Sequence, residues 1–231
     1  MTGIEAVLFD WGGTLTPWHA VDLVAQWRVY AQAYDPARAE PLAHALHEQE
    51  MLAWRRAEQH QRSGTLDDLM RAAGVEPSGD RHEVAIRAYI DAWAPHTQID
   101  PDAPALLTSL RDLGIRVGVL SNTMWSRAHH EAVFERDGVL ALIDGAVYSS
   151  EIAYTKPHPE AFRAAMTAVG VTDPQAVVFV GDRLFDDVSG AKAVGMRAVY
   201  VPHSAVPEHD AEPDATIQRL ADLLPLVRSW V

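Results

Sequence analysis

Short apolar runs recur along the chain, each bounded by Gly, Asp, Ser or Asn, and they restrict the fold more than any other feature. A short run of apolar residues without alternation is typical of a strand that is buried on both faces of its sheet. Patterns with helical spacing lie between the runs, and this alternation favours a parallel sheet with helices on both faces. We therefore predict an α/β fold. The predicted strands are Ala6–Phe9, Ile115–Leu120, Ala146–Tyr148, Ala176–Val180 and Ala198–Val201.

A long segment separates the first predicted strand from the second, and it far exceeds the usual length of a connection between strands. Its apolar residues recur with helical spacing over residues 23–34, 66–73 and 85–93. We predict an all-helical domain at residues 17–99, inserted into a core domain formed by residues 1–16 and 100–231. Because the insertion follows the first strand directly, we expect it to lie over the carboxyl end of that strand.

The balance of charges limits the possible partners. The chain of 231 residues carries 19 Lys and Arg against 32 Asp and Glu, which gives a formal net charge of -13. Such an acidic chain repels nucleic acid and anionic membrane surfaces, so we expect neither as a partner. Any anionic ligand must therefore be held by a local site. The sequence gives no indication of the oligomeric state.

The absence of cysteine also excludes several kinds of chemistry. Without Cys there can be no disulfide, thiolate nucleophile or cysteine-based metal site, and the composition is compatible with a reducing compartment. The apolar run Ile4–Phe9 is too short for a secretory or membrane-spanning helix. We therefore expect a cytoplasmic protein.

Polar residues follow the predicted strands at the points where the strands end. In open parallel sheets the ligand lies beyond the carboxyl ends of the strands, so these side chains should gather at one edge. Singly, each is typical of a helix cap or a solvated charge, but their convergence at four strand ends favours a binding site. Several carboxylates in one pocket repel one another, which predicts a bound metal ion. The residues are Asp10, Ser121, Asn122, Lys156, Asp182, Asp186 and Asp187.

Four motifs occupy these strand ends: Asp10–Leu15, Leu120–Asn122, Lys156–Glu160, and Gly181–Asp182 with Asp186–Asp187. In order and spacing they resemble the four motifs of the haloacid dehalogenase superfamily, in the branch with a helical cap inserted after motif one. The resemblance extends from Ile4 to about Val201. It implies a Rossmann-like core with an all-helical cap. It also implies hydrolysis of a small phosphorylated metabolite through an aspartyl-phosphate, as in most members.

The resemblance makes Asp10 the nucleophile, and electrostatics explains the charges expected around it. A carboxylate that attacks phosphorus approaches a group that is already anionic, so positive charge must offset the repulsion. Lys156 would supply one positive charge. A Mg²⁺ ion, which prefers oxygen ligands, would supply the other.

The resemblance also implies two sets of binding residues. The Mg²⁺ ligands would be Asp10, the backbone carbonyl of Gly12, Asp182 and Asp187, with Asp186 as the alternative to Asp187. The phosphate-binding residues would be Ser121, Asn122 and Thr14. Thr14 is also expected to hold the shape of the motif loop.

Gly12 departs from the family pattern, because most phosphatases of the family carry a second Asp at this position. That Asp protonates the leaving oxygen and later activates water, and such a group contributes about 10²- to 10⁴-fold in rate. We therefore expect weak turnover, or a restriction to leaving groups that depart easily. His19 and Asp186 are the candidates to replace the missing acid.

Two other functions are compatible with this glycine. The 2-haloacid dehalogenases also lack the second Asp and attack carbon without a metal, but they lack the acidic fourth motif found here. The other alternative is a catalytically feeble module that binds a ligand or partner. The clustered charges of Asp10, Lys156 and Asp182 count against it, because keeping charged groups together is costly.

Two histidine pairs, His44 with His47 and His129 with His130, invite a metal-site interpretation. The histidines are spaced by three or by one residue on acidic, Gln-rich helical segments, and this arrangement is more typical of a solvated helix face than of a metal site. We therefore interpret both pairs as parts of solvated helix faces.

Overall fold

Six parallel strands form a single sheet within residues 3–202 and 209–230, the part of the chain that this computed structural model describes. The strand order is β3-β2-β1-β4-β5-β6, which places β1 at the centre of the motif-bearing strands. The α/β fold with a parallel sheet is thus confirmed. The strands are β1 (Ala6–Phe9), β2 (Arg116–Ser121), β3 (Gly145–Tyr148), β4 (Val177–Gly181), β5 (Arg197–Tyr200) and β6 (Ala215–Thr216).

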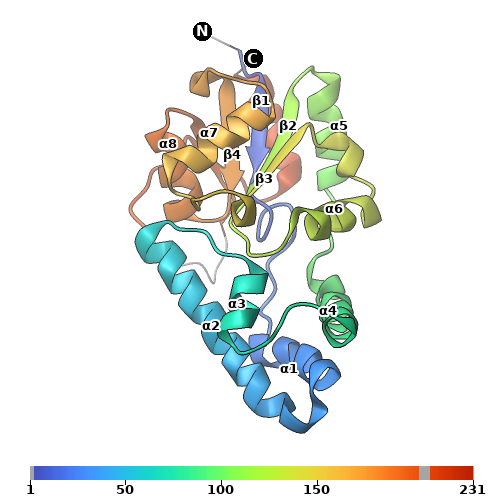
Figure 1. Ribbon diagram of the computed structural model, residues 1–231. Helices are drawn as coiled ribbons and strands as arrows, with labels where there is room; N and C mark the ends of the chain where they lie inside the picture. The colour runs from blue at the N-terminus through green and yellow to red at the C-terminus, as the bar shows by residue number, and fades with distance from the viewer. Residues whose placement is uncertain (1–2, 203–208, 231) are drawn as a thin grey trace.

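Helices cover both faces of this sheet (Figure 1). Because successive side chains of a strand point to opposite faces, Val7 packs in one cluster with Leu107 of α5, whereas Leu8 packs in the other with Phe162 of α7. The core helices are α5 (Ala103–Asp112), α6 (Arg127–Arg136), α7 (Pro159–Ala168), α8 (Gly190–Ala193) and α9 (Leu223–Arg228). A π-helical turn, η6 (Leu184–Ser189), follows β4.

Four helices follow β1 and lie beyond the carboxyl ends of the strands, as Figure 1 shows. We call them the helical insertion: α1 (Leu23–Tyr34), α2 (Ala39–His60), α3 (Leu66–Ala72) and α4 (Asp80–Trp93). Its helices bury a separate apolar cluster, which includes Trp27, Tyr30, Met70 and Tyr89. Core residue Met124 joins this cluster, so the insertion packs against the loop after β2.

The proposed domain bounds, 17–99 for the insertion and 1–16 with 100–231 for the core, stay a prediction. Residues 1 and 231, the outer bounds of the core, lie outside the described part of the chain. Short 3₁₀ turns complete the fold: η1 (Pro36–Arg38), η2 (Ala94–His96), η3 (Leu140–Leu142), η4 (Ser149–Glu151), η5 (Pro174–Ala176) and η7 (Leu220–Asp222). In the described ranges, no helix has the length and apolar character needed to cross a bilayer.

Candidate active site

Asp10 stands at the carboxyl end of the central strand. Phe9, the last residue of β1, lies opposite Val119 of β2 and Val180 of β4 in parallel register. The Asp10 backbone N–H still donates to the Val180 carbonyl at 2.9 Å, so sheet pairing fixes the backbone of Asp10 itself. Its carboxylate is buried at the edge where the neighbouring strands also end.

Lys156 places its ammonium between two of the predicted site carboxylates. The Nζ atom donates to Asp10 Oδ1 at 2.6 Å and to Asp187 Oδ1 at 2.7 Å, and the lysine is 2% exposed. Burial alone would lower the pKa of Lys156, but the two carboxylates outweigh burial and raise this pKa above its ordinary value. The lysine therefore stays charged beside Asp10.

Asp182 completes a buried cluster of three carboxylates. One oxygen each from Asp10, Asp182 and Asp187 lie within 4.8 Å of one another. Both Asp182 oxygens are buried without a hydrogen-bond partner among the described residues. The loop after β1 approaches closely at Gly13, where an added Cβ would lie 2.4 Å from Asp182 Oδ2. Burial, together with the charge of Asp10 and Asp187, raises the pKa of Asp182 above its ordinary value.

The cluster has the composition of a site for a doubly charged hard cation. Three carboxylates face a single ammonium, so a divalent ion would neutralise the group. All the available side-chain ligands are oxygens, which Mg²⁺ prefers. Burial likewise raises the pKa of Asp187, against the opposing charge of Lys156. The unpartnered oxygens of Asp182 are the groups that such an ion would satisfy.

Asn122 holds the lysine rather than standing free. Its side chain accepts a hydrogen bond from the Lys156 N–H at 2.7 Å and donates one to the Lys156 carbonyl at 3.0 Å. Ser121, the last residue of β2, is buried at the same edge of the sheet. Thr14 is buried too, and its hydroxyl has no hydrogen-bond partner among the described residues. The structure therefore gathers the predicted residues of the first three motifs at one edge.

The residues considered as replacements for the missing acid lie outside the carboxylate cluster. Gly12 forms a single bridge with Thr16 inside the loop after β1. His19 is exposed, and its ring stands edge-on to that of His96 at a centroid distance of 5.5 Å. Asp186 is half-buried and lies 3.9 Å from the Arg183 guanidinium. Of the two acids of the fourth motif, Asp187 is the one that joins Asp10 and Asp182.

Arg183 is a charged neighbour that the sequence analysis did not single out. Its backbone N–H donates to Asp187 Oδ2 at 2.9 Å, and its guanidinium lies 5.9 Å from the centre of the Trp18 ring. Burial alone would lower the pKa of Arg183, but the surrounding carboxylates, Asp182 first, raise it. The sequence did offer a signal for Arg183. It directly follows Asp182, and residues at the ends of parallel strands lie at the same edge of the sheet.

The prediction of solvated histidines is wrong for His129 and His130, both of which are buried. The His130 ring stacks on Tyr148 at 4.5 Å, stands edge-on to Trp11 at 4.5 Å, and lies 3.1 Å from the Thr123 hydroxyl. Burial lowers the pKa of His129 to about 4 and that of His130 to about 3. The neutral His130 ring packs against Trp11 of the loop after β1, and the neutral His129 ring stacks on Trp125 of the loop after β2. The other pair differs, because His44 is exposed and His47 half-buried.

Residues 4–195 match the family of haloacid dehalogenase-like hydrolases. The chain belongs to this family. The match spans strands β1 to β4 and all four motifs, together with the helical insertion. This match confirms the family resemblance that the four motifs indicated.

The relatives of this hydrolase include enzymes with different names. It is 31% identical over 168 residues to a glyceraldehyde 3-phosphate phosphatase of Methanopyrus kandleri, and the match covers 71% of each chain. It is 32% identical over 124 residues to a phosphoserine phosphatase of Thermus thermophilus, covering 53% of this chain and 49% of the relative. An L-2-haloacid dehalogenase from Xanthobacter autotrophicus superposes with a TM-score of 0.66 at 25% identity, covering 99% and 100% of the two chains.

Proposed function

We propose that this hydrolase removes the phosphoryl group from a small phosphorylated metabolite, with Asp10 as nucleophile and Mg²⁺ as cofactor. The observation that carries the proposal is the Lys156 ammonium, 2.6 Å from Asp10 Oδ1 in a buried cluster with Asp182 and Asp187. Relatives named as phosphatases support the same reaction class. The acidic net charge supports a small substrate rather than a nucleic acid, and the cysteine-free chain is compatible with a cytoplasmic location.

The Mg²⁺ ion would be held by Asp10, Asp182 and Asp187, together with the backbone carbonyl of Gly12. The unpartnered oxygens of Asp182 and the excess of carboxylates over cations support this assignment. When bound, Mg²⁺ supplies positive charge and orients the phosphoryl group for attack. Gly13 keeps a side chain out of the space beside Asp182.

The reaction proceeds in two displacements. A carboxylate oxygen of Asp10 forms a bond to phosphorus, the bond to the leaving oxygen breaks, and an aspartyl-phosphate results. Water then attacks phosphorus, the bond to Asp10 breaks, and inorganic phosphate is released. The Lys156 ammonium reduces the repulsion between the Asp10 carboxylate and the phosphoryl oxygens. Asn122 fixes the Lys156 backbone, and the hydroxyls of Ser121 and Thr14 are the proposed phosphate donors.

The leaving oxygen gains no proton from residue 12, because glycine has no side chain. Leaving groups that are stable as anions, such as aryl oxides, are therefore favoured over simple alkoxides. A Cβ added at Gly12 meets no heavy atom within 4 Å, so Gly12→Asp is compatible with the loop. This variant should raise turnover of alkyl phosphates by about 10²-fold or more, and that of aryl phosphates by less. Equal gains on both classes would remove the leaving-group argument.

The function is tested by hydrolysis of 4-nitrophenyl phosphate with and without Mg²⁺, followed by a panel of small phosphate esters. We expect Mg²⁺-dependent turnover that Asp10→Asn abolishes. The isosteric substitution keeps the size of the side chain and removes the nucleophilic charge. Turnover that is no higher in the wild type than in Asp10→Asn, for every ester tested, would favour the binding module instead.

A second candidate function is dehalogenation of a 2-haloacid. Two observations favour it. Gly12 leaves the site without the second acid, and the chain is structurally similar to the Xanthobacter autotrophicus enzyme. In that reaction Asp10 would attack carbon, halide would leave, and water would hydrolyse the ester without a metal. The unpartnered Asp182 has no task in such a scheme. Chloride release from 2-chloropropionate in the presence of a metal chelator would decide for this candidate.

A further inference from the structure

A cavity of about 300 Å³ lies where the helical insertion meets the core. This volume is at the lower end of the range for small-molecule sites, so it suits a metabolite of a few carbon atoms. The insertion contributes α2 and the segment after it, and the core contributes the loops after β2 and β3. The lining residues that matter here are Trp54, Arg56, Arg62, Thr123, Met124 and Thr155.

The core side of this cavity belongs to the loops that carry the proposed active site. Thr123 directly follows Asn122, and Thr155 directly precedes Lys156, whose ammonium contacts Asp10. The Thr155 hydroxyl is buried and has no hydrogen-bond partner among the described residues. The cavity therefore borders the two loops that carry Asn122 and Lys156.

Backbone hydrogen bonds join the insertion to the core next to residues that line the cavity. The Thr155 N–H donates to the Gln61 carbonyl at 3.1 Å, and the Leu66 N–H donates to the Met124 carbonyl at 2.9 Å. Both contacts join a residue of the insertion to a loop of the core. The cavity walls are therefore fixed relative to the strand ends in this arrangement.

Two guanidinium groups border the cavity, and the lining carboxylate Asp68 already pairs with Arg71 at 3.6 Å. Among the described residues, neither Arg56 nor Arg62 forms an ion pair, whereas Arg28 of the insertion pairs with Glu40 at 2.5 Å. The Arg62 guanidinium lies 4.7 Å from the centre of the Tyr154 ring. Stacking on a ring orients a guanidinium and leaves its N–H donors available in the plane. In a chain with a net charge of -13, two such cations form a local anion site.

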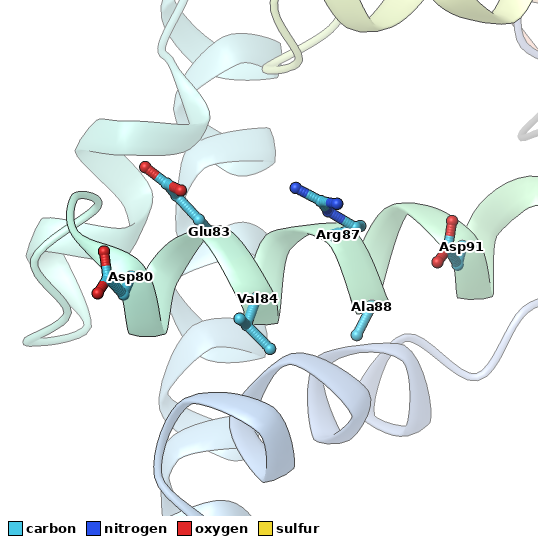
Figure 2. Close-up of a pocket in the computed structure, with 6 residues that line it drawn as sticks. All are labelled: Asp80, Glu83, Val84, Arg87, Ala88 and Asp91. Carbon is cyan, nitrogen blue, oxygen red and sulfur yellow. The ribbon is translucent and has the colours of Figure 1, made fainter.

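A second depression, on α4, has the opposite character. Figure 2 shows its lining side chains on a single helix, where Asp80, Glu83 and Asp91 accompany Arg87. Three carboxylates repel an anion, and none of the lining residues belongs to a strand-end loop. This depression is therefore less suited to an anion than the cavity between insertion and core.

We propose that this cavity receives the leaving group of the substrate, and that Arg56 and Arg62 select leaving groups that carry a carboxylate. This inference rests on the proposed function and narrows it to phosphate esters of small hydroxy acids. Such a carboxylate accepts charge-assisted hydrogen bonds from one or both guanidinium groups. The cavity wall formed by Trp54 and Met124 packs against the carbon chain.

The experiment compares two esters that differ mainly in a carboxylate, 3-phosphoglycerate and glycerol 3-phosphate, each in the presence of Mg²⁺. We expect kcat/KM of the wild type to favour 3-phosphoglycerate by about tenfold or more, the worth of a hydrogen bond to a charged group. Arg56→Gln, Arg62→Gln and the double variant should reduce this ratio, chiefly by raising KM for 3-phosphoglycerate. Arg55→Gln is the matched control, because Arg55 is exposed on the same helix and does not line the cavity.

The outcomes separate this inference from the proposed function. Turnover of 4-nitrophenyl phosphate tests the phosphatase reaction in every variant, and it should not change in the arginine variants. A wild-type ratio near one, or a ratio that the double variant leaves unchanged, overturns the carboxylate selection while the phosphatase function stands. Failure of the wild type to hydrolyse any ester overturns both.

Discussion

The strand-end cluster and the interior of the helical insertion both bury a carboxylate, but the two carboxylates differ in their hydrogen-bond partners. In the insertion, Glu50 is 8% exposed and accepts a hydrogen bond from Trp27 Nε1 at 2.7 Å. In the core, Asp182 is fully buried, and neither of its oxygens has a hydrogen-bond partner among the described residues. A buried polar group without a partner is costly. The insertion thus provides a hydrogen-bond donor for its buried acid, whereas the described part of the core provides none for Asp182.

We expect the largest effect on turnover and stability from a substitution of Lys156, whose ammonium pairs with Asp10 and Asp187. Lys156→Met should reduce turnover by at least about 10²-fold, because it removes a charge beside the reacting group. It should also lower the free energy of unfolding by about 3–5 kcal/mol, since it leaves Asp10 and Asp187 unpaired. Steady-state kinetics and denaturant unfolding measure both effects.

The chain provides a control at its other lysine. Lys192 pairs with Asp214 at 2.6 Å on the surface, so Lys192→Met should change the unfolding free energy by about 1 kcal/mol or less. Similar losses in the two lysine variants would contradict the special position of Lys156.

The next largest effect concerns the acid without a partner. Asp182→Asn removes a buried charge, so it should raise the stability of the metal-free protein by about 1–3 kcal/mol. The same change should abolish the rise in Tm that Mg²⁺ causes in the wild type. Thermal unfolding with and without Mg²⁺ measures both. Asp186→Asn should keep the Mg²⁺ response, and loss of that response would transfer the metal role from Asp187 to Asp186.

Glu50 gives the matching test in the insertion. Burial raises the pKa of Glu50 above its ordinary value. Its ionisation is therefore harder in the folded state, and stability is lost as the pH rises through the folded-state pKa. Glu50→Gln keeps an oxygen for the Trp27 N–H, so it should be more stable than the wild type at neutral pH and similar to it in acid. A Tm difference that does not vary with pH would contradict this account.

We expect the smallest effect on stability at neutral pH from a substitution of His130, near the contact between the insertion and the core. Tyr89 of the insertion stacks on Trp125 of the core, which stacks on His129, and His130 follows. Burial lowers the pKa of His130 to about 3, below its ordinary unfolded value of about 6.5. Stability should therefore be lost as the pH falls from about 6.5 toward about 3, where the ring must accept a proton.

His130→Phe keeps a ring against Tyr148 and removes the titrating group. The fall of Tm with decreasing pH should be shallower in this variant than in the wild type. Differential scanning calorimetry across this pH range measures the slopes. Parallel curves would show that His130 contributes nothing to the acid sensitivity.

The strands and the clustered motif residues were predictable because their signals are local. A strand buried on both faces is an uninterrupted apolar run, and each of the five predicted strands lies within one residue of its observed bounds. The two-residue edge strand β6 carries no such pattern. Helix α2 was not delimited, because its buried stripe consists of Leu42, Leu46, two alanines and the acid Glu50 in an otherwise polar segment.

The remainder of the site depends on contacts between distant residues. His130 is buried by Tyr148 and Trp11, and neither contact has a counterpart in the histidine's own helix. Likewise, the cavity beside Arg62 exists because the insertion meets the loop before Lys156. The hydrogen bonds of Asn122 to Lys156 also required the fold, since the two residues belong to different motifs.

The two adjacent glycines of the first motif differ in their freedom to vary. A Cβ at Gly13 would overlap the carboxylate of Asp182, and its φ of +91° is strained for any other residue, whereas Gly12 faces open space. Natural drift or laboratory selection can therefore add or remove a proton donor at residue 12 while residue 13 stays invariant. The range of esters accepted by such an enzyme can thus broaden or narrow through one codon, without rebuilding the charged centre beside it.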